Sequence, residues 1–389
     1  MSTQAAPSIL FTHTNPQDGF RLLELSPELE ELLTSKDAPV LELKSPSTAL
    51  AQAVLDPAAQ DYVNLCTPTQ TYRIRQVQSS NSLHILRPSH AEISQADIKV
   101  VTEDEDPLSL PSEAVTAIAK CSSTLELHIP PGGFSAVPFL EKSLRLYDPR
   151  ADDGDVAMEA ESAPLDAKRV REMRERLWRD IPVSEKQCAS GWMEVCGFVD
   201  SGEEIACWRP SARARLRVWK RVVEGSVLQG IDLEKQFLVR DLWRAVLDED
   251  DEVEVPFPRA LLEAVVRRIC VEEERVDLRD EIKWASFDRV ECTQWVGETY
   301  LAATAPISSS AIGRSEFLRG WKDCLPESWR AEAALSKLKN GCYSSPDPTT
   351  IFFVEPSQRQ QASKTSSAPA TAAKAKNTRN WHELLKGSR

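Results

Sequence analysis

Six lysine and arginine residues between positions 314 and 339 are the side chains with the clearest chemical use in this sequence. Such side chains neutralise phosphates, which gives nucleic-acid binding that depends strongly on salt and little on base sequence. For any one of them alone, an ordinary solubilising charge on a helix is the better explanation. The set as a whole, together with a basic stretch after position 356, favours contact with DNA. Its members are Arg314, Arg319, Lys322, Arg330, Lys337 and Lys339.

Motifs for catalysis and for cofactor binding are missing from the sequence. It has no P-loop, no G-x-S-x-G, no H-E-x-x-H and no G-x-G-x-x-G. Cys188, Cys196 and Cys207 lack the spacing of paired metal ligands and have no histidine among them, which favours buried free thiols. The acidic run 248–252 is compatible with a cation site but is more typical of a solvated loop. We therefore predict that the chain is not an enzyme and needs no cofactor or metal.

The elements expected around the basic residues follow the order helix, helix, helix, hairpin. Ser315 is a good cap for a first helix, in which apolar residues recur at helical spacing. Pro326 ends that helix and suits the first turn of a second one, and residues 335–341 form a third. Residues 342–344 and 351–354 are typical of two short strands. This order is the outline of a winged helix, a module that binds DNA or docks on protein.

At 389 residues the chain is long enough for two to four domains of mixed α+β class. Helical periodicity around short strand signals predicts two further winged helices before the last one. In these segments Ser184 and Gln187 predict a capping box at a helix start, and residues 237–246 are predicted to form one helix. An acidic stretch resembles a linker, and a stretch rich in Gln, Ser, Ala and Lys resembles a disordered tail. The expected order is a flexible N-terminus (1–19), a β-barrel assembly domain (20–150), an acidic linker (151–165), three winged helices (166–230, 231–305 and 306–356) and a disordered basic tail (357–389).

Short apolar runs between residues 20 and 131 predict five or six strands of a small barrel or sandwich. Ser26 as a cap and Pro27 in the first turn predict one early helix among them. The apolar residues of the strands fall on both faces, which leaves a face or an edge uncovered and favours a partner that completes the barrel. A self-contained β domain with ordinary packing fits the same pattern, and both interpretations stay open. The candidate partner-contacting residues are Leu22, Leu23, Leu25, Tyr72, Ile74, Leu83 and Ile85.

The net charge of −13 argues against a protein whose whole surface binds nucleic acid. The charge is uneven, because residues 356–389 hold seven basic residues against Glu383 alone and so carry +6. An acidic body with a basic tail is typical of an adapter. In that tail, the spacing of Trp381, Leu384 and Leu385 fits either a short docking helix or an accidental apolar cluster. Nine single cysteines and no secretory signal favour the cytosol or nucleus.

Two stretches of the chain resemble the "defective in sister chromatid cohesion" family. The first contains Leu-Leu-Glu-Leu at 22–25, a Cys-Thr strand that leads into residues 71–72, and Ser-Asn-Ser at 80–82 before an apolar strand. The second contains FLRGWKDCLPESW, LSKLKNGCYSS and TIFFVE, which are similar to that family's final winged helix. The resemblance spans most of residues 20–355. The acidic insert after Val246 and the basic tail depart from the family pattern.

This resemblance implies a non-catalytic adapter subunit of an alternative replication factor C clamp loader in the nucleus. Members pair their β region with a small accessory subunit and with the C-terminal end of the large loader subunit. That module and the first winged helix dock onto DNA polymerase epsilon, and the later winged helices bind single- and double-stranded DNA. Other loader subunits hydrolyse ATP, and the complex loads or unloads PCNA for cohesion and checkpoint signalling. The alternative function is that of a stand-alone winged-helix DNA-binding regulator of transcription.

Overall fold

The protein is a mixed α+β structure that divides into two compact units. The first unit comprises Met1–Ala136 with Arg179–Cys188, and the second comprises Val137–Trp178 with Ala189–Arg389. The computed structural model describes residues 10–46, 62–89, 114–148, 166–200, 205–247, 257–271, 277–278, 280–355 and 359. Several expectations fall outside these ranges, namely those for residues 1–9, the acidic linker 151–165, the acidic run 248–252 and the basic tail apart from Arg359.

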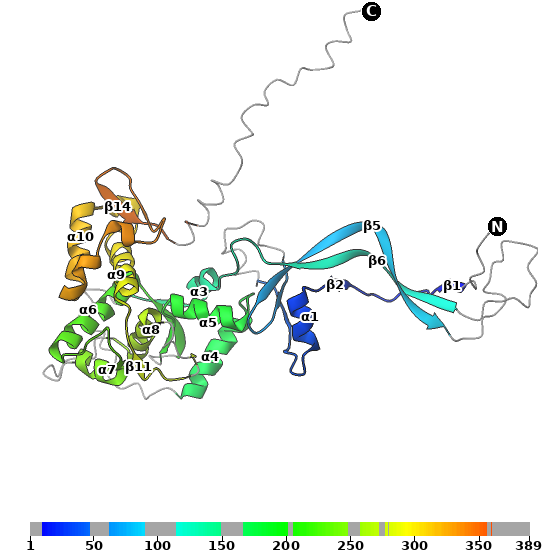
Figure 1. Cartoon of the computed structure of the whole chain (residues 1–389), viewed down its shortest axis with the longest axis horizontal. Coiled ribbons are helices and arrows are strands. Elements are labelled where there is room, and N and C mark those ends of the chain that lie inside the picture. The colour runs from blue at the N-terminus through cyan, green and yellow to red at the C-terminus, as the bar shows by residue number, and fades with distance from the viewer. Residues whose placement is uncertain are drawn as a thin grey trace, which may run out of the picture. The chain divides into compact units, whose positions relative to one another are not determined.

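A six-stranded sheet that curls into a half barrel forms the first unit. Its centre is the antiparallel ribbon of β5 (Thr71–Ser89) and β6 (Ala114–His128), which Figure 1 shows twisting along its length. The register shifts twice within this ribbon, and such irregularities bend strands and increase their twist. The strand order is β1-β6-β5-β4-β3, with β2 also paired to β6. The four short strands are β1 (Leu10–His13), β2 (Leu22–Glu24), β3 (Glu42–Lys44) and β4 (Asn64–Cys66).

Helix α1 (Pro27–Thr34) packs against the β4–β5 part of this sheet. The side chain of Ser26 accepts a hydrogen bond from the Leu29 N–H at 3.4 Å, and Pro27 occupies the first turn, which confirms the predicted helix start. Leu29 is buried with Leu65 and Tyr72. These three residues form a small core cluster under the helix.

The second unit is mainly helical. Its helices are α3 (Val137–Ser143), α4 (Ala167–Arg179), α5 (Glu185–Glu194), α6 (Ala212–Leu228), α7 (Val239–Leu247), α8 (Arg259–Ile269), α9 (Arg289–Thr304) and α10 (Arg314–Asp323), of which α4 and α5 extend into the 179–188 segment of the first unit. None of these described helices has the length and apolar content that a membrane crossing requires.

Three small sheets accompany these helices. Their strands are β7 (Arg145–Tyr147), β9 (Ala206–Pro210) and β8 (Phe198–Asp200) in the first, β10 (Phe237–Leu238) and β11 (Trp284–Ala285) in the second, and β12 (Ile312–Gly313), β14 (Thr350–Phe353) and β13 (Tyr343–Ser344) in the third. The sequence analysis assigned residues 237–238 to a helix, but they pair with β11 as β10, and the helix begins only at Val239.

The predicted order of three helices and a hairpin is present near the end of the chain. After α10 come the 3-10 helices η5 (Glu327–Glu332) and η6 (Leu335–Lys337), and then the β13–β14 hairpin. The predicted cap is wrong, because α10 begins at Arg314 and Gly313 precedes it, so Ser315 lies inside the helix. The short strand β12 pairs with β14 and was not predicted, since two residues carry no alternating pattern.

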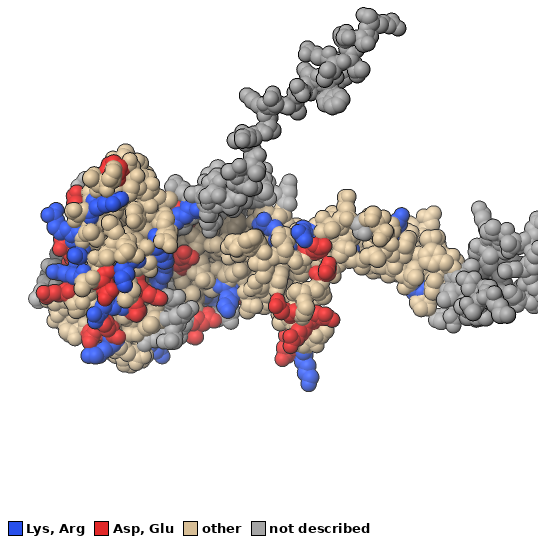
Figure 2. Space-filling view, turned by 45° about the horizontal axis from the view of Figure 1, so that its top comes forward, with Lys and Arg blue, Asp and Glu red and all other residues tan. Residues whose placement is uncertain are grey.

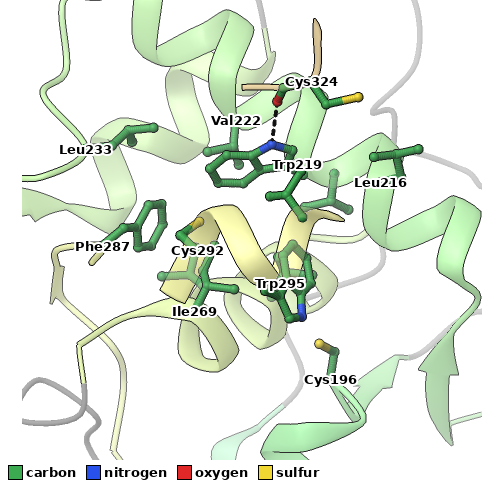
Figure 3. Packing of buried hydrophobic residues seen from close by; sticks show 14 of the residues in the cluster. Cys196, Leu216, Trp219, Val222, Leu233, Ile269, Phe287, Cys292, Trp295 and Cys324 are labelled. Atoms are coloured by element: carbon green, nitrogen blue, oxygen red, sulfur yellow. Dashed lines mark hydrogen bonds between the residues drawn. The ribbon is translucent and has the colours of Figure 1, made fainter. Parts of the chain in front are cut away.

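One continuous hydrophobic core joins the segments predicted as separate winged helices. It extends from Cys196 to Ile351, and Figure 3 shows part of it around Trp219 of α6. The indole Nε1 of Trp219 donates to the Cys324 carbonyl at 2.7 Å, and its ring stacks on Trp329 with 6.1 Å between ring centroids. The core is therefore continuous across positions 230 and 305, where boundaries between winged helices were predicted. Those domain boundaries stay predictions.

Candidate interaction surfaces

Helix α10 carries three of the six predicted DNA-contacting residues, and they are not equivalent. Arg319 and Lys322 are exposed and lie three residues apart, which places them on one face of the helix. Arg314 is half-buried, its Nη2 donates to Ser345 Oγ at 3.0 Å, and its Nε is buried without a hydrogen-bond partner among the described residues. Arg314 therefore joins the start of α10 to the turn after β13, whereas the other two project to solvent.

The remaining three predicted residues lie on the two 3-10 helices and in the turn after them. Arg330, Lys337 and Lys339 are all exposed. Lys337 forms an ion pair with Glu332 at 3.6 Å, and an exposed pair of this kind contributes little and is easily displaced. Acidic residues alternate with the basic ones, and Figure 2 shows both signs mixed over the visible face of the second unit. The acidic neighbours in sequence are Glu316, Asp323, Glu327 and Glu332.

A second basic surface, which the sequence analysis missed, lies on α6. A groove of about 620 Å³ runs between this helix and the end of α9. The spacing of the basic residues in ARARLRVWKR could have predicted this surface. The apolar residues of the same helix are spaced just as regularly, and they were interpreted first, as its buried face. The groove is lined by Arg213, Arg217, Lys220, Arg221, Ala303 and Thr304, together with Leu216 and Glu224.

Large apolar side chains are exposed over the sheet of the first unit. Within the described part of this unit, ten of them have an exposed fraction of 37 % or more. Figure 2 shows few charged side chains along the β5–β6 ribbon. The exposed residues are Phe11, Phe20, Leu23, Leu25, Val40, Leu43, Val63, Leu83, Leu86 and Ile129.

The seven predicted partner-contacting residues differ in burial. Leu23, Leu25 and Leu83 are exposed, with exposed fractions of 37 %, 37 % and 51 %. Tyr72 is buried against α1 and belongs to the unit's own core. The other three residues are half-buried, and they are Leu22, Ile74 and Ile85.

Strand β3 forms one edge of the sheet, and no described strand covers its outer side. The backbone N–H and C=O groups of such an edge are free to pair with a strand of another chain. Val40 and Leu43 are the most exposed large apolar side chains of the described part of this unit, at 83 % and 69 %. An open backbone edge and uncovered apolar side chains therefore lie together at β3.

Buried free thiols were predicted, and all nine cysteines are free and buried, which confirms that expectation. Burial raises the pKa of the Cys188 thiol to about 12 and that of the Cys207 thiol to about 11, so both stay protonated at neutral pH. Within the described ranges, the structure contains no group of three or more His, Cys, Asp or Glu side chains that is arranged to hold a metal ion.

The family model for the sister chromatid cohesion protein Dcc1 matches residues 20–360 of the chain. No curated protein matches the sequence. The matched region includes the half-barrel sheet with its exposed apolar residues, the α6 groove and all six predicted DNA-contacting residues. Because the match covers far more than half of the chain, the chain belongs to the Dcc1 family of sister chromatid cohesion proteins and has its role in sister chromatid cohesion and DNA replication.

Proposed function

We propose that the chain is a non-catalytic adapter subunit of an alternative replication factor C complex, which it links to DNA polymerase epsilon and to DNA. In this role it acts in the nucleus and supports loading or unloading of PCNA, cohesion and the replication checkpoint. Membership of the Dcc1 family supports the cohesion and replication part of the proposal. The exposed surfaces of the two units support the contacts with partners.

The uncovered sheet of the first unit is the observation that carries this proposal. Fully burying a side chain such as leucine or phenylalanine stabilises a complex by about 1.5–3 kcal/mol. Ten exposed apolar side chains in one small unit therefore favour a partner that covers them. Strand addition at the β3 edge would satisfy backbone groups at the same time. The strands would come from the small accessory subunit and from the C-terminal end of the large loader subunit.

We interpret the helical part of the second unit as three consecutive winged helices. The order α10, η5, η6 and the β13–β14 hairpin, to which β12 adds a third strand, supports the last of them. Its exposed basic residues would contact the phosphates of single- and double-stranded DNA. The first winged helix would dock onto the polymerase together with the sheet, and PCNA would be reached only through the loader.

Two double variants, matched in residue type, test whether the exposed apolar residues at β3 bind the partner subunits. Val40→Asp with Leu43→Asp places two charges at the β3 edge, whereas Val227→Asp with Leu228→Asp does so at the end of α6, where the exposed fractions are 71 % and 69 %. Each full-length variant is co-expressed with the small accessory subunit and the C-terminal segment of the large subunit. Size-exclusion chromatography with light scattering then gives the stoichiometry, and circular dichroism confirms the fold of each variant.

We expect the β3 variant to lose both partner subunits and the α6 variant to retain them. If both variants assemble like the unchanged chain, the β3 surface is not the assembly site. If the unchanged chain binds neither subunit and purifies as a folded monomer that binds DNA, the adapter function is wrong and the stand-alone transcription regulator is favoured.

A separate measurement tests the DNA contact of the last winged helix. Replacing Arg319, Lys322 and Arg330 by glutamine removes three exposed positive charges without adding bulk. Fluorescence anisotropy over a salt series should show weaker binding to both single- and double-stranded DNA, and a log–log salt slope reduced by about 2 to 3. Unchanged affinity and slope would show that these side chains do not contact DNA.

A further inference from the structure

The solvent-facing side of α6 presents four positive charges in one row, formed by Arg213, Arg217, Lys220 and Arg221. Spacings of four, seven and eight residues from Arg213 bring side chains to the same side of a helix with 3.6 residues per turn. At 1.5 Å per residue, the row is about 12 Å long. It forms one wall of the groove, and the end of α9 forms the other. We call these four residues the α6 row.

The α6 row is held rigidly, because the opposite side of the helix is part of the core. Val218, Trp219 and Val222 have no exposed surface. Figure 3 shows Trp219 and Val222 directed into the packed interior, and the Trp219 indole fixed to the Cys324 carbonyl. A rigid helix fixes the spacing of the charges that it carries, so little order has to be gained when a ligand binds.

Most of the positive charge in the row is available to a ligand. Arg213, Arg217 and Lys220 form no ion pair with any residue that the structure describes. Arg221 pairs with Glu224 across 3.8 Å, and both side chains are largely exposed, so that pair competes weakly. Among the described residues that line the groove, the acidic one is Glu224. Two further carboxylates share a neighbour with the row: Asp200 and Arg217 both lie near Tyr147, and Asp323 and Lys220 both lie near Cys324.

The remaining lining favours phosphates over bases. Ala303 and Thr304 are small, and the described residues that line the groove include no aromatic ring on which an unpaired base would stack. Arginine and lysine are common donors to the phosphate oxygens of the DNA backbone. A strand of duplex DNA advances 3.4 Å per nucleotide along the helix axis, so a rigid row of about 12 Å faces roughly three steps. We propose that the α6 row binds the phosphate backbone of double-stranded DNA.

The α6 row also lies close to the end of α10. Burial raises the pKa of the Cys324 thiol, and the nearby Lys220 ammonium opposes that rise, which places Lys220 beside the residue that follows α10. Lys322 is two residues away from Cys324 along the chain. Helix α6 lies within residues 166–230, the segment proposed above to dock onto the polymerase. The α6 row would give this segment a DNA contact as well, and it rests on the proposed function only for the choice of ligand.

Full-length variants with matched charge changes test the inference. Arg213→Gln, Arg217→Gln and Lys220→Gln together remove three charges from the row, while Arg169→Gln, Arg176→Gln and Arg179→Gln remove three exposed charges from α4. Anisotropy is measured with a 20-base-pair duplex of random sequence and with poly-glutamate, between 50 and 200 mM salt. Circular dichroism and thermal melting confirm that both variants are folded.

We expect the α6 variant to bind the duplex with a log–log salt slope smaller by about 2 to 3, and the α4 variant to match the unchanged chain. Equal slopes for the α6 variant and the unchanged chain would overturn the inference. If the α6 variant changes binding only to poly-glutamate, the α6 row binds an acidic protein and not DNA, which also overturns the inference. In either case the α10 variant described above still decides the proposed DNA contact independently.

Discussion

The two units of this molecule differ in how far their apolar residues are buried. The first has a small core cluster of Leu29, Leu65 and Tyr72 and leaves ten large apolar side chains exposed among its described residues. The second buries a continuous cluster from Cys196 to Ile351, in which the side chains of Trp219, Trp321 and Trp329 are almost fully covered. We therefore expect the second unit to be stable by itself, and the first to gain stability when the proposed partner subunits cover its exposed apolar side chains.

Trp219→Ala should have the largest effect on this comparison. Removing a buried tryptophan costs about 3–5 kcal/mol, because a cavity remains in the core, and here the Cys324 carbonyl also loses its hydrogen-bond donor. Urea denaturation monitored by near-UV circular dichroism measures the loss. Trp284→Ala is the control, since Trp284 is 47 % exposed, and its effect should be clearly smaller than that of Trp219→Ala. Similar losses for both variants would contradict a core centred on Trp219.

Thr71→Val tests how the first unit is held together. The Thr71 hydroxyl accepts a hydrogen bond from the Ser184 N–H at 2.7 Å and donates one to Gln187 Oε1 at 2.5 Å. Valine has a similar shape but leaves these groups unsatisfied, which costs about 1–3 kcal/mol. Amide hydrogen exchange should show lost protection in β4 and β5 but unchanged protection in α6 and α9. Thr69→Val is the matched control, because Thr69 is exposed. Equal loss of protection in both units would show that they are not independent.

A pH series on Cys188 should give the smallest effect. Burial raises the pKa of this thiol to about 12 in the folded chain, from an ordinary value of 9.0. Between these values the unfolded thiol loses its proton and the folded one keeps it, so stability falls as pH rises, by up to about 1.4 kcal/mol per pH unit. The stability of the first unit in urea, measured at pH 8, 9 and 10, should therefore fall less steeply for Cys188→Ala. Parallel slopes would show that this thiol ionises equally in both states.

Local signals in the sequence were sufficient for elements that depend only on their neighbours. Ser26 with Pro27 correctly marked the start of α1, and Ser184 with Gln187 correctly marked a capping box, in which the Gln187 N–H donates to Ser184 Oγ at 3.3 Å. The order of helices and strands after Arg314 was also predictable. In each case the side chain and the backbone group that it serves are at most a few residues apart.

Long-range contacts decided what could not be predicted. Ser315 is not the cap, because the Arg314 N–H donates to the Thr349 carbonyl at 2.9 Å. This bond fixes the chain ahead of Ser315, and the helix already begins at Arg314. The half-buried Arg314 side chain also donates to Ser345 Oγ, 31 positions along the chain. The α6 row could be recognised as one wall of a groove only in the folded chain, where the end of α9 forms the other wall. The spacing of residues along the sequence does not reveal which distant segments come into contact.

The hydrogen bond from the Ser184 N–H to Thr71 Oγ1 has a consequence for the order of folding. The two residues are 113 positions apart, so the ribosome must add more than a hundred residues before this bond can form. Long-range contacts of this kind slow folding, and a growing chain exposes its unfinished surfaces meanwhile. We expect β4 and β5 to emerge well before the segment around Ser184 that contacts Thr71, which gives partner subunits or chaperones the first opportunity to cover this part of the sheet during translation.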